Sequence, residues 1–425
     1  MMTSGGKRPS RIWLDVTTSQ ASGTAYNGTV RVERSLIREL PRCLGDRLAF
    51  CIFNQSLGRF SAVSAPALPV MTAAAPVHER SNRAVRNVGR LVERRVRFFV
   101  RAIIRWSSEM NIIPERSHSF EASGGDIILL AGENWSRYDF SVLRKLKQQR
   151  GIRFAVVLQD LAPLVCPQFF EQGPFLSRFK DYIDFLAADA DTVLTISDST
   201  SADFQRATAA TVTRSRVARI ELGADAISGA SHVRPAELSD DRPFVLSVST
   251  IQSRKNFDLL YRLWQRFALD REVDVPRLVI VGRPGFGGAD LLHQIRNDPL
   301  VANRVTLIGH ASDSELGWLY RNCLFTVYPS WYEGWGLPLT ESLAYGKTFV
   351  ASDRSSLPEA GQGLGIHLDP YDLVAWRGEV LRLSRNQQAR HALEERIRND
   401  RRIPTWADSA RSVVAALDDL QSARM

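Results

Sequence analysis

Two carboxylates, Glu333 and Glu341, stand on either side of a glycine-containing loop, with seven residues between them. The apolar run at 324–328 precedes the loop and predicts a buried strand. A helix should follow, because Pro338 stands where proline favours a helix start and Gly346 where glycine favours a helix end. The first amide groups of such a helix attract a phosphate or a developing negative charge. The pattern therefore predicts a site for a sugar that carries a phosphate, with the two carboxylates binding its hydroxyl groups.

Two adjacent cations, Arg254 and Lys255, are expected to reach the same site. They follow the predicted strand at 244–248, and ligands of open parallel sheets bind beyond the carboxyl ends of the strands. An arginine fork and a lysine point charge together suit a diphosphate. A glycine-rich turn that begins at Gly282 follows the run at 278–281 and is a second candidate for binding a base or a phosphate. The alternative for these groups, and for the two glutamates, is an ordinary solvated surface.

The composition indicates a soluble globular protein of two domains, since the chain has 425 residues, of which 44% are hydrophobic and 24% charged. No apolar run reaches the roughly 18 residues of a membrane-spanning helix, and the N-terminus lacks the apolar core of a signal peptide. Cysteines and histidines are dispersed without metal-ligand spacing. We therefore expect no metal site, no cofactor, and reduced thiols in a cytoplasmic protein.

A strongly basic element lies at 79–106, where nine arginines and two glutamates account for +7 of the net charge of +9. Its arginines and its apolar residues both follow helical spacing, on roughly opposite faces. This favours a basic amphipathic helix on the anionic inner surface of the cytoplasmic membrane, with a core helix as the alternative. Nucleic acid is not expected, because no recognition motif accompanies the charge. The arginines predicted to face the membrane are Arg83, Arg86, Arg90, Arg94, Arg97, Arg101 and Arg105.

Short apolar runs alternate with helical patterns, which predicts an α/β fold with two Rossmann-like parallel-sheet domains that face a central cleft. We expect a first domain at 1–222, a linker at 223–242, a second domain at 243–403, and a C-terminal helix at 404–425 that packs back on the first domain. The expected strands are 12–16, 49–53, 126–130, 154–158, 192–196, 217–221, 244–248, 278–281, 305–308, 324–328 and 348–351. The expected helices lie near 29–40, 83–106, 138–149, 174–188, 199–208, 256–268, 313–322 and 338–345.

The second half of the chain carries an ordered series of motifs, at 247–260, 278–288, 305–323, 328–347 and 355–359. Over nearly the whole second domain this series resembles the GT4-type retaining glycosyltransferases of the GT-B fold, also called glycosyltransferase group 1. The first domain, which binds the variable acceptor in that family, is similar only in places, at 27–32, 159–163 and 195–198.

The resemblance implies a role for each group of the site. Arg254 and Lys255 would neutralise the leaving nucleotide diphosphate, the largest electrostatic demand of the reaction, without a metal. Glu333 would stabilise the cationic anomeric carbon of the transferred sugar, and Glu341 would bind the ribose hydroxyls. Further donor contacts would come from Gly282, Gly334, Trp335, Gly336 and Leu337, and the acceptor side of the cleft would include Gly28 and Asp160.

Two positions depart from the family pattern. Gln159 stands where many relatives have histidine, which removes or replaces a contact to the donor sugar. Ser249 stands where glycine is usual, close to the expected phosphate. Both departures leave the identity of the donor open.

The sequence therefore predicts a metal-independent retaining hexosyltransferase that is peripheral on the inner face of the cytoplasmic membrane. By resemblance, the donor is GDP-mannose or a UDP-sugar, and the acceptor is a lipid-linked oligosaccharide or a nascent polysaccharide. Two other classes stay open: another sugar-nucleotide enzyme, such as an epimerase, and a catalytically silent nucleotide-sugar-binding protein. A glycosidase also uses two carboxylates, but it has no use for a phosphate site.

Overall fold

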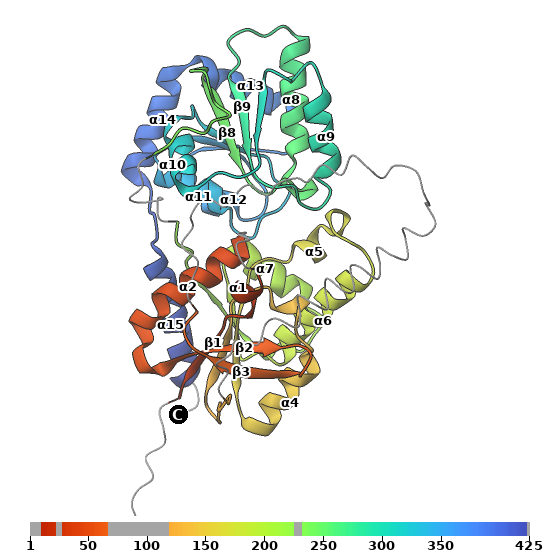
Figure 1. The fold of residues 1–425 in the computed structure, drawn as a ribbon, viewed down its shortest axis with the longest axis vertical. Coiled ribbons are helices and arrows are strands. Elements are labelled where there is room, and N and C mark those ends of the chain that lie inside the picture. Colours follow the sequence, from red (N-terminus) through yellow and green to blue (C-terminus); the bar gives the residue numbers. More distant parts are fainter. Residues whose placement is uncertain (1–9, 23–27, 67–118, 225–231, 423–425) are drawn as a thin grey trace, which may run out of the picture.

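The computed structural model describes residues 10–22, 28–66, 119–224 and 232–422, which form two α/β units, one above the other in Figure 1. The strands of the first unit are β1 (Ile12–Asp15), β2 (Leu48–Asn54), β3 (Arg59–Val63), β4 (Ile127–Leu130), β5 (Arg153–Leu158), β6 (Thr192–Thr195) and β7 (Arg216–Arg219). Its helices are α1 (Thr17–Ala21), α2 (Gly28–Leu44), α4 (Phe140–Arg150), α5 (Ala162–Val165), α6 (Pro174–Ala188) and α7 (Asp198–Ala207).

The strands of the second unit are β8 (Phe244–Val248), β9 (Arg277–Val281), β10 (Val305–Ile308), β11 (Thr326–Tyr328), β12 (Phe349–Ser352) and β13 (Ile366–Leu368). The later helices are α8 (Phe257–Leu269), α9 (Ala289–Asn297), α10 (Asp313–Asn322), α11 (Leu337–Ala344), α12 (Leu357–Ala360), α13 (Leu373–Arg385), α14 (Gln387–Asp400) and α15 (Trp406–Ser422). Short 3-10 turns lie at η1 (Gly45–Arg47), η2 (Asn134–Ser136), η3 (Pro167–Phe169) and η4 (Ser253–Lys255).

The first sheet has the order β3-β2-β1-β4-β5-β6-β7, and its strands run parallel except for β3, which pairs antiparallel with β2. Neither this strand nor an antiparallel pair was predicted, so the prediction of parallel strands throughout this sheet is corrected at its edge. Only Phe60 of β3 is buried. The strand therefore lacks the continuous apolar run by which buried parallel strands are recognised.

The second sheet has the order β10-β9-β8-β11-β12-β13 with parallel neighbours, so the predicted pair of parallel-sheet domains is confirmed. The expected strands all appear within two residues of their predicted ends. Strand β13 and helices α9, α13 and α14 were not among the predicted elements. Within the described residues, no helix combines the length and the apolar composition needed to cross a membrane. The predicted basic helix at 79–106 lies outside the described residues.

The last helix of the chain belongs to the first sheet. Together with α2, α15 covers one face of that sheet, where Leu14, Leu36, Trp406 and Leu417 share one hydrophobic core. Figure 1 shows α15 beside α2, below the second unit. Helices α4 and α6 line a second core around Phe154, on the opposite face of the sheet. Both faces of the first sheet are therefore buried, as a parallel sheet requires.

Polar contacts fix the end of α15 as well. Arg47 Nη2 donates to Asp418 Oδ1 at 2.8 Å, and Arg153 Nη1, from the start of β5, donates to the Leu420 carbonyl at 2.7 Å. The helix is thus tied to the sheet by packing along its length and by hydrogen bonds at its end.

Replacing Leu417 by alanine should destabilise the first unit, because its side chain is fully buried between α15 and the sheet. A deletion of this size in a core lowers the free energy of unfolding by about 2–5 kcal/mol. Urea unfolding followed by circular dichroism measures the change. Asp419→Ala, at an exposed position on the same helix, is the control and should change little. Equal unfolding curves for the two variants would contradict the docking of α15.

Candidate active site

A cleft of about 1490 Å³ lies between the two units, where β5, β8, β9 and β10 end. Its wall is made by side chains and loops from both units. The structure brings to this wall every residue predicted for the catalytic, donor and acceptor roles, namely Gly28, Asp160, Arg254, Lys255, Gly282, Glu333, Gly334, Trp335, Gly336, Leu337 and Glu341. The seven arginines predicted to face a membrane lie outside the described residues.

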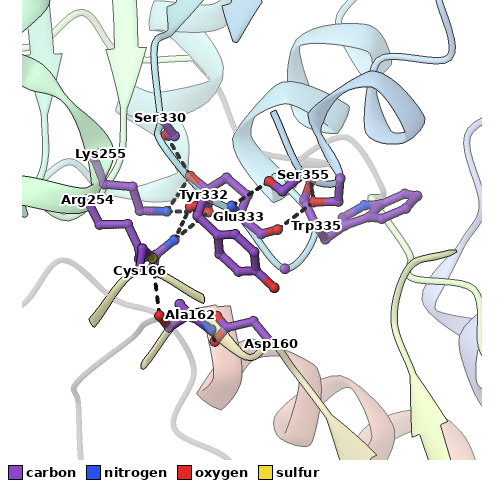
Figure 2. A network of polar contacts seen from close by, with 12 residues as sticks. Asp160, Ala162, Cys166, Arg254, Lys255, Ser330, Tyr332, Glu333, Trp335 and Ser355 are labelled. Atoms are coloured by element: carbon purple, nitrogen blue, oxygen red, sulfur yellow. Dashed lines mark hydrogen bonds and ion pairs between the residues drawn. The ribbon is translucent and has the colours of Figure 1, made fainter. Parts of the chain in front are cut away.

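Glu333 is the centre of a buried ion cluster, shown in Figure 2. Lys255 Nζ donates to both carboxylate oxygens, at 2.5 and 2.6 Å, and Arg254 Nη1 lies 3.3 Å from Glu333 Oε2. Ser330 Oγ donates to Glu333 Oε1 at 2.8 Å. The three charged side chains are only 12–14% exposed. The two cations therefore converge on the carboxylate from the end of the neighbouring strand, at the edge where ligands bind.

A tight turn after β8 aims both cations at Glu333. The short 3-10 turn η4 carries Arg254 and Lys255, and Asn256 ends it in the left-handed conformation with φ +54°. Asparagine tolerates this conformation better than most residues. Its side-chain amide donates to the Pro329 carbonyl at 3.1 Å, in the loop that leads to Glu333. This hydrogen bond joins the turn of the cations to the loop of the carboxylate.

Charge decides the protonation of this cluster. Burial raises the pKa of Glu333, but the charges of Lys255 and Arg254 and their hydrogen bonds outweigh it, so that the pKa lies below its ordinary value. Burial lowers the pKa of Lys255, and the charge of Arg254 acts in the same direction, whereas Glu333 opposes both. The two cations thus favour the ionised carboxylate and outweigh the opposing effect of burial.

The segment after Glu333 is held by two serines from the start of α12. The Glu333 backbone N–H donates to Ser355 Oγ at 2.8 Å. Ser356 Oγ donates to the carbonyls of Glu333 and Trp335, both at 2.9 Å. These residues belong to the 355–359 motif, so that motif fixes the backbone on which the carboxylate stands.

Helix α11 begins at Leu337, after Gly336 in the left-handed region with φ +111°, and Gly346 follows its end with φ +68°. The predicted start near Pro338 and end near Gly346 are confirmed. A side chain at Gly336 would also approach a methyl group of Leu357 to 2.8 Å. The glycine therefore lets the loop turn sharply, so that the first amides of α11 face the cleft.

Glu341 is buried, since it is 3% exposed. The alternative interpretation of Glu341 as a solvated surface residue is therefore wrong. Arg31, from α2 of the first unit, donates through Nη1 to Glu341 Oε1. Tyr320 Oη, from α10, donates to Glu341 Oε2 at 2.7 Å. Both oxygens are therefore fixed in position, one of them by a residue of the opposite domain. The Arg31 guanidinium also lies over the ring of Trp406, 5.8 Å from its centroid.

The glycine at 282 is required by a close approach of two loops. Its φ is +159°, and a Cβ there would stand 1.9 Å from the Ser249 carbonyl oxygen. Ser249 and Gly282 both line the cleft. Ser249, which departs from the family pattern, thus lies on the cleft wall of the second unit, and its backbone carbonyl is the group that requires glycine at 282.

The first unit lines the cleft with the residues at the end of β5. Asp160 Oδ1 accepts a hydrogen bond from the Ala162 backbone N–H at 3.0 Å, which fixes its side chain in the turn before α5. Gln159 Nε2 donates to the Ala131 carbonyl at 3.2 Å. Gly28, the first residue of α2, also lies on this wall. In the described residues no group of histidine, cysteine and carboxylate side chains is arranged to hold a metal ion.

Several residues of the site escaped the sequence analysis. Arg31 lies in the 27–32 segment and was not assigned a role, although its pairing with Glu341 makes it part of both halves. Ser330 and Tyr320 were likewise not singled out, since a lone hydroxyl has no sequence signal. One sequence signal was available for Arg31: it is a basic residue in the first turn of a helix that opens onto a cleft.

Residues 231–400 match the family model described as "Glycosyl transferases group 1". Among curated proteins, O-antigen chain mannosyltransferase B of Escherichia coli is 26% identical over 237 residues, which cover 54% of this chain and 60% of that protein. The serotype-specific mannosyltransferase WbdA of Escherichia coli is 26% identical over 226 residues, 51% of this chain and 27% of that protein. The chain thus spans less than two thirds of the length of these relatives.

Solved structures match the fold of the whole chain. Sucrose-phosphate synthase from Thermosynechococcus elongatus superposes with a TM-score of 0.59 at 17% identity, covering 97% of this chain and all of that one. The HepE protein of Anabaena, solved in complex with UDP and glucose, superposes with a TM-score of 0.60 at 14% identity, covering 96% and 99%. The match over 231–400 shows that the second domain is that of the group 1, GT4-type glycosyltransferases, and the paired sheets and the solved structures show that the whole chain has the GT-B fold.

Proposed function

We propose that this chain transfers a sugar from a nucleotide-sugar donor to a hydroxyl group of an acceptor, with retention of the anomeric configuration. The observation that carries the proposal is the buried cluster of Glu333, Lys255 and Arg254 on the wall of a cleft between two domains. A carboxylate kept ionised beside two cations suits a reaction in which positive charge develops on a sugar and negative charge on its leaving diphosphate.

The two cations act on the leaving group. When the bond between the anomeric carbon and the diphosphate oxygen lengthens, negative charge grows on that oxygen, and Lys255 and Arg254 are within reach of the same point of the cleft. The first amides of α11 add a positive dipole end to this electrostatic field. Because Glu333 already orders both cations, the field is in place before the donor binds.

Glu333 acts on the sugar. Its side chain is 12% exposed, and in such a site a carboxylate interacts strongly with the positive anomeric carbon. Glu341 and the loop at Gly282 would hold the nucleoside end of the donor. Asp160, on the opposite wall, would face the acceptor hydroxyl. These assignments place the donor on the second domain and the acceptor on the first.

The transferred sugar is proposed to be mannose, and GDP-mannose the first donor to test. The support is that the curated relatives are named O-antigen and serotype-specific mannosyltransferases. The acceptor on this reading is a lipid-linked oligosaccharide or a growing polysaccharide at the cytoplasmic membrane face. Interconversion of the donor sugar without an acceptor would instead indicate an epimerase, and binding without turnover a silent binder.

Glu333→Gln should lower the transfer rate constant kcat by about 100-fold or more, because the amide removes the charge that opposes the anomeric cation. Binding of the nucleoside diphosphate, measured by calorimetry, should stay within about threefold. Glu395→Gln, at an exposed position on α14, is the control. Transfer within about threefold of the unsubstituted protein would remove Glu333 from the reaction.

Lys255→Met should move the acidic limb of the pH profile of kcat to higher pH. Methionine keeps most of the length of the side chain without its charge. The pKa of Glu333 then rises, because Arg254 is the one cation left in the cluster to oppose the effect of burial. Since the carboxylate must be ionised, activity is lost at a higher pH as the solution is acidified. The profile is measured with saturating donor and compared with Lys145→Met, an exposed control. An unshifted limb would show that Lys255 does not set the charge of Glu333.

Membrane attachment through residues 79–106 is proposed from the sequence alone. Replacing Arg90, Arg94, Arg97 and Arg101 by glutamine should release the full-length protein from vesicles that contain phosphatidylglycerol, because each cation near such a surface adds about 1 kcal/mol. Co-sedimentation measures the bound fraction. Neutral phosphatidylcholine vesicles are the control and should bind neither form. Equal sedimentation of both forms with anionic vesicles would refute the surface helix.

A further inference from the structure

Tyr332, the residue before Glu333, extends from the second domain into the first. It is 4% exposed and packs with Ala162 and Cys166 of the first domain. Its hydroxyl donates to Asp203 Oδ2 at 2.6 Å, on α7. The same oxygen accepts the backbone N–H of Leu161, the residue after Asp160, at 3.4 Å. One phenol group thus joins the neighbour of Glu333 to the neighbour of Asp160, as the ring between these segments in Figure 2 illustrates.

The residue after Glu333 makes a second contact between the same two segments. A Cβ on Gly334 would stand 2.1 Å from the Gln159 carbonyl oxygen and 2.9 Å from Asp160 Cβ. Thr200 Oγ1, on α7, donates to the Gly334 carbonyl at 3.4 Å. The residues on both sides of Glu333 therefore touch the residues on both sides of Asp160.

Helix α7 is held by the second domain at its N-terminus as well. Glu359 accepts the backbone N–H groups of Asp198 and Ser199, both at 2.8 Å, and so caps a helix of the other domain. Asp203, one to two turns further on, is 5% exposed and also pairs with Arg206. The partner of the Tyr332 hydroxyl is thus itself fixed in place.

We propose, on the basis of the function proposed above, that Tyr332 is a positioning residue. Its hydrogen bonds to Asp203 and Leu161 set the relative position of Glu333 and Asp160, which is called their register below. In the correct register the activated sugar reacts with the acceptor hydroxyl, which is transfer. In a loosened register it reacts with water, which is hydrolysis of the donor. In both reactions the bond from the anomeric carbon to the diphosphate oxygen breaks and a bond to an incoming hydroxyl oxygen forms. The proton of that hydroxyl leaves with the nucleoside diphosphate or passes to solvent.

The register matters because a displacement of about 1 Å between reacting groups can cost on the order of 100-fold in rate. The ion cluster of the donor half does not include the Tyr332 hydroxyl. Lys255, Arg254 and Glu333 bind one another within the second domain, and Gly282 lies in that domain too. Loss of the Tyr332 hydroxyl should therefore leave donor binding and the departure of the diphosphate intact. It should change only whether the acceptor hydroxyl or water receives the sugar.

The test is Tyr332→Phe in the full-length protein, with radiolabelled GDP-mannose as donor and a membrane lipid extract as acceptor. We expect kcat for transfer to fall by about tenfold while KM for the donor stays within about threefold. The ratio of donor hydrolysis to transfer should rise at least about fivefold. Asp203→Asn, which keeps the shape and an acceptor oxygen but loses the charge, should shift the ratio in the same direction by less.

The matched control is Tyr261→Phe. Tyr261 is 8% exposed and its hydroxyl donates to Asp298 at 2.9 Å, so the change also removes one hydrogen bond from a buried tyrosine to an aspartate. That pair joins α8 to the segment after α9, inside the second domain. The control should lose comparable thermal stability but keep kcat and the ratio of hydrolysis to transfer unchanged.

Two different results would separate failure of this inference from failure of the proposed function. If Tyr332→Phe keeps the transfer rate and the hydrolysis ratio of the unsubstituted protein, or if Tyr261→Phe shifts them equally, Tyr332 has no positioning role. If the unsubstituted protein releases no nucleoside diphosphate from GDP-mannose or from UDP-sugars, the transfer function itself is wrong, and the inference falls with it.

Discussion

The buried contact between Glu333 and its two cations is the constraint around which the second domain is arranged. Either sign left alone in this position would cost about 3–5 kcal/mol, so the loop after β11 and the turn after β8 must meet. The two segments are held in place by Asn256 in its left-handed conformation, by the two serines before α12 and by Gly336. The same cluster offers concentrated charge to a ligand. One interaction therefore orders the loops and prepares the electrostatic field of the site.

The first domain completes this site through several contacts, two of which lie beside its carboxylates. Arg31 pairs with Glu341 across the cleft, and Tyr332 reaches down to α7. Each of the two carboxylates is thus supported by the opposite domain, Glu341 directly and Glu333 through its neighbours. Because the acceptor half is built from the same segments, α2 and the turn after β5, the spacing of the two half-sites follows from these contacts. The shape and the charge of the cleft therefore depend on the contacts between the two domains.

Local sequence pattern predicted the parts that depend on local structure. The strand, glycine loop and helix around Glu333 could be located because proline, glycine and apolar periodicity act over a few residues. The pairing of Arg31 with Glu341 could not, since it joins residues 310 positions apart and depends on how two sheets face each other. Strand β3 was missed for a related reason: at a half-exposed edge, its stability comes from pairing with β2 and leaves little pattern in its own residues.

The position of α15 has a consequence for the order in which the protein can fold. The core on one face of the first sheet contains Trp406, Val413, Leu417 and Leu420, which leave the ribosome after the whole second domain. At synthesis rates of about 5–20 residues per second, the first sheet waits roughly 10–40 s for this helix after its own last strand has emerged. The second domain is complete before that moment. Although it comes later in the chain, it can fold first, and the first domain closes its core only after the second domain has been synthesised.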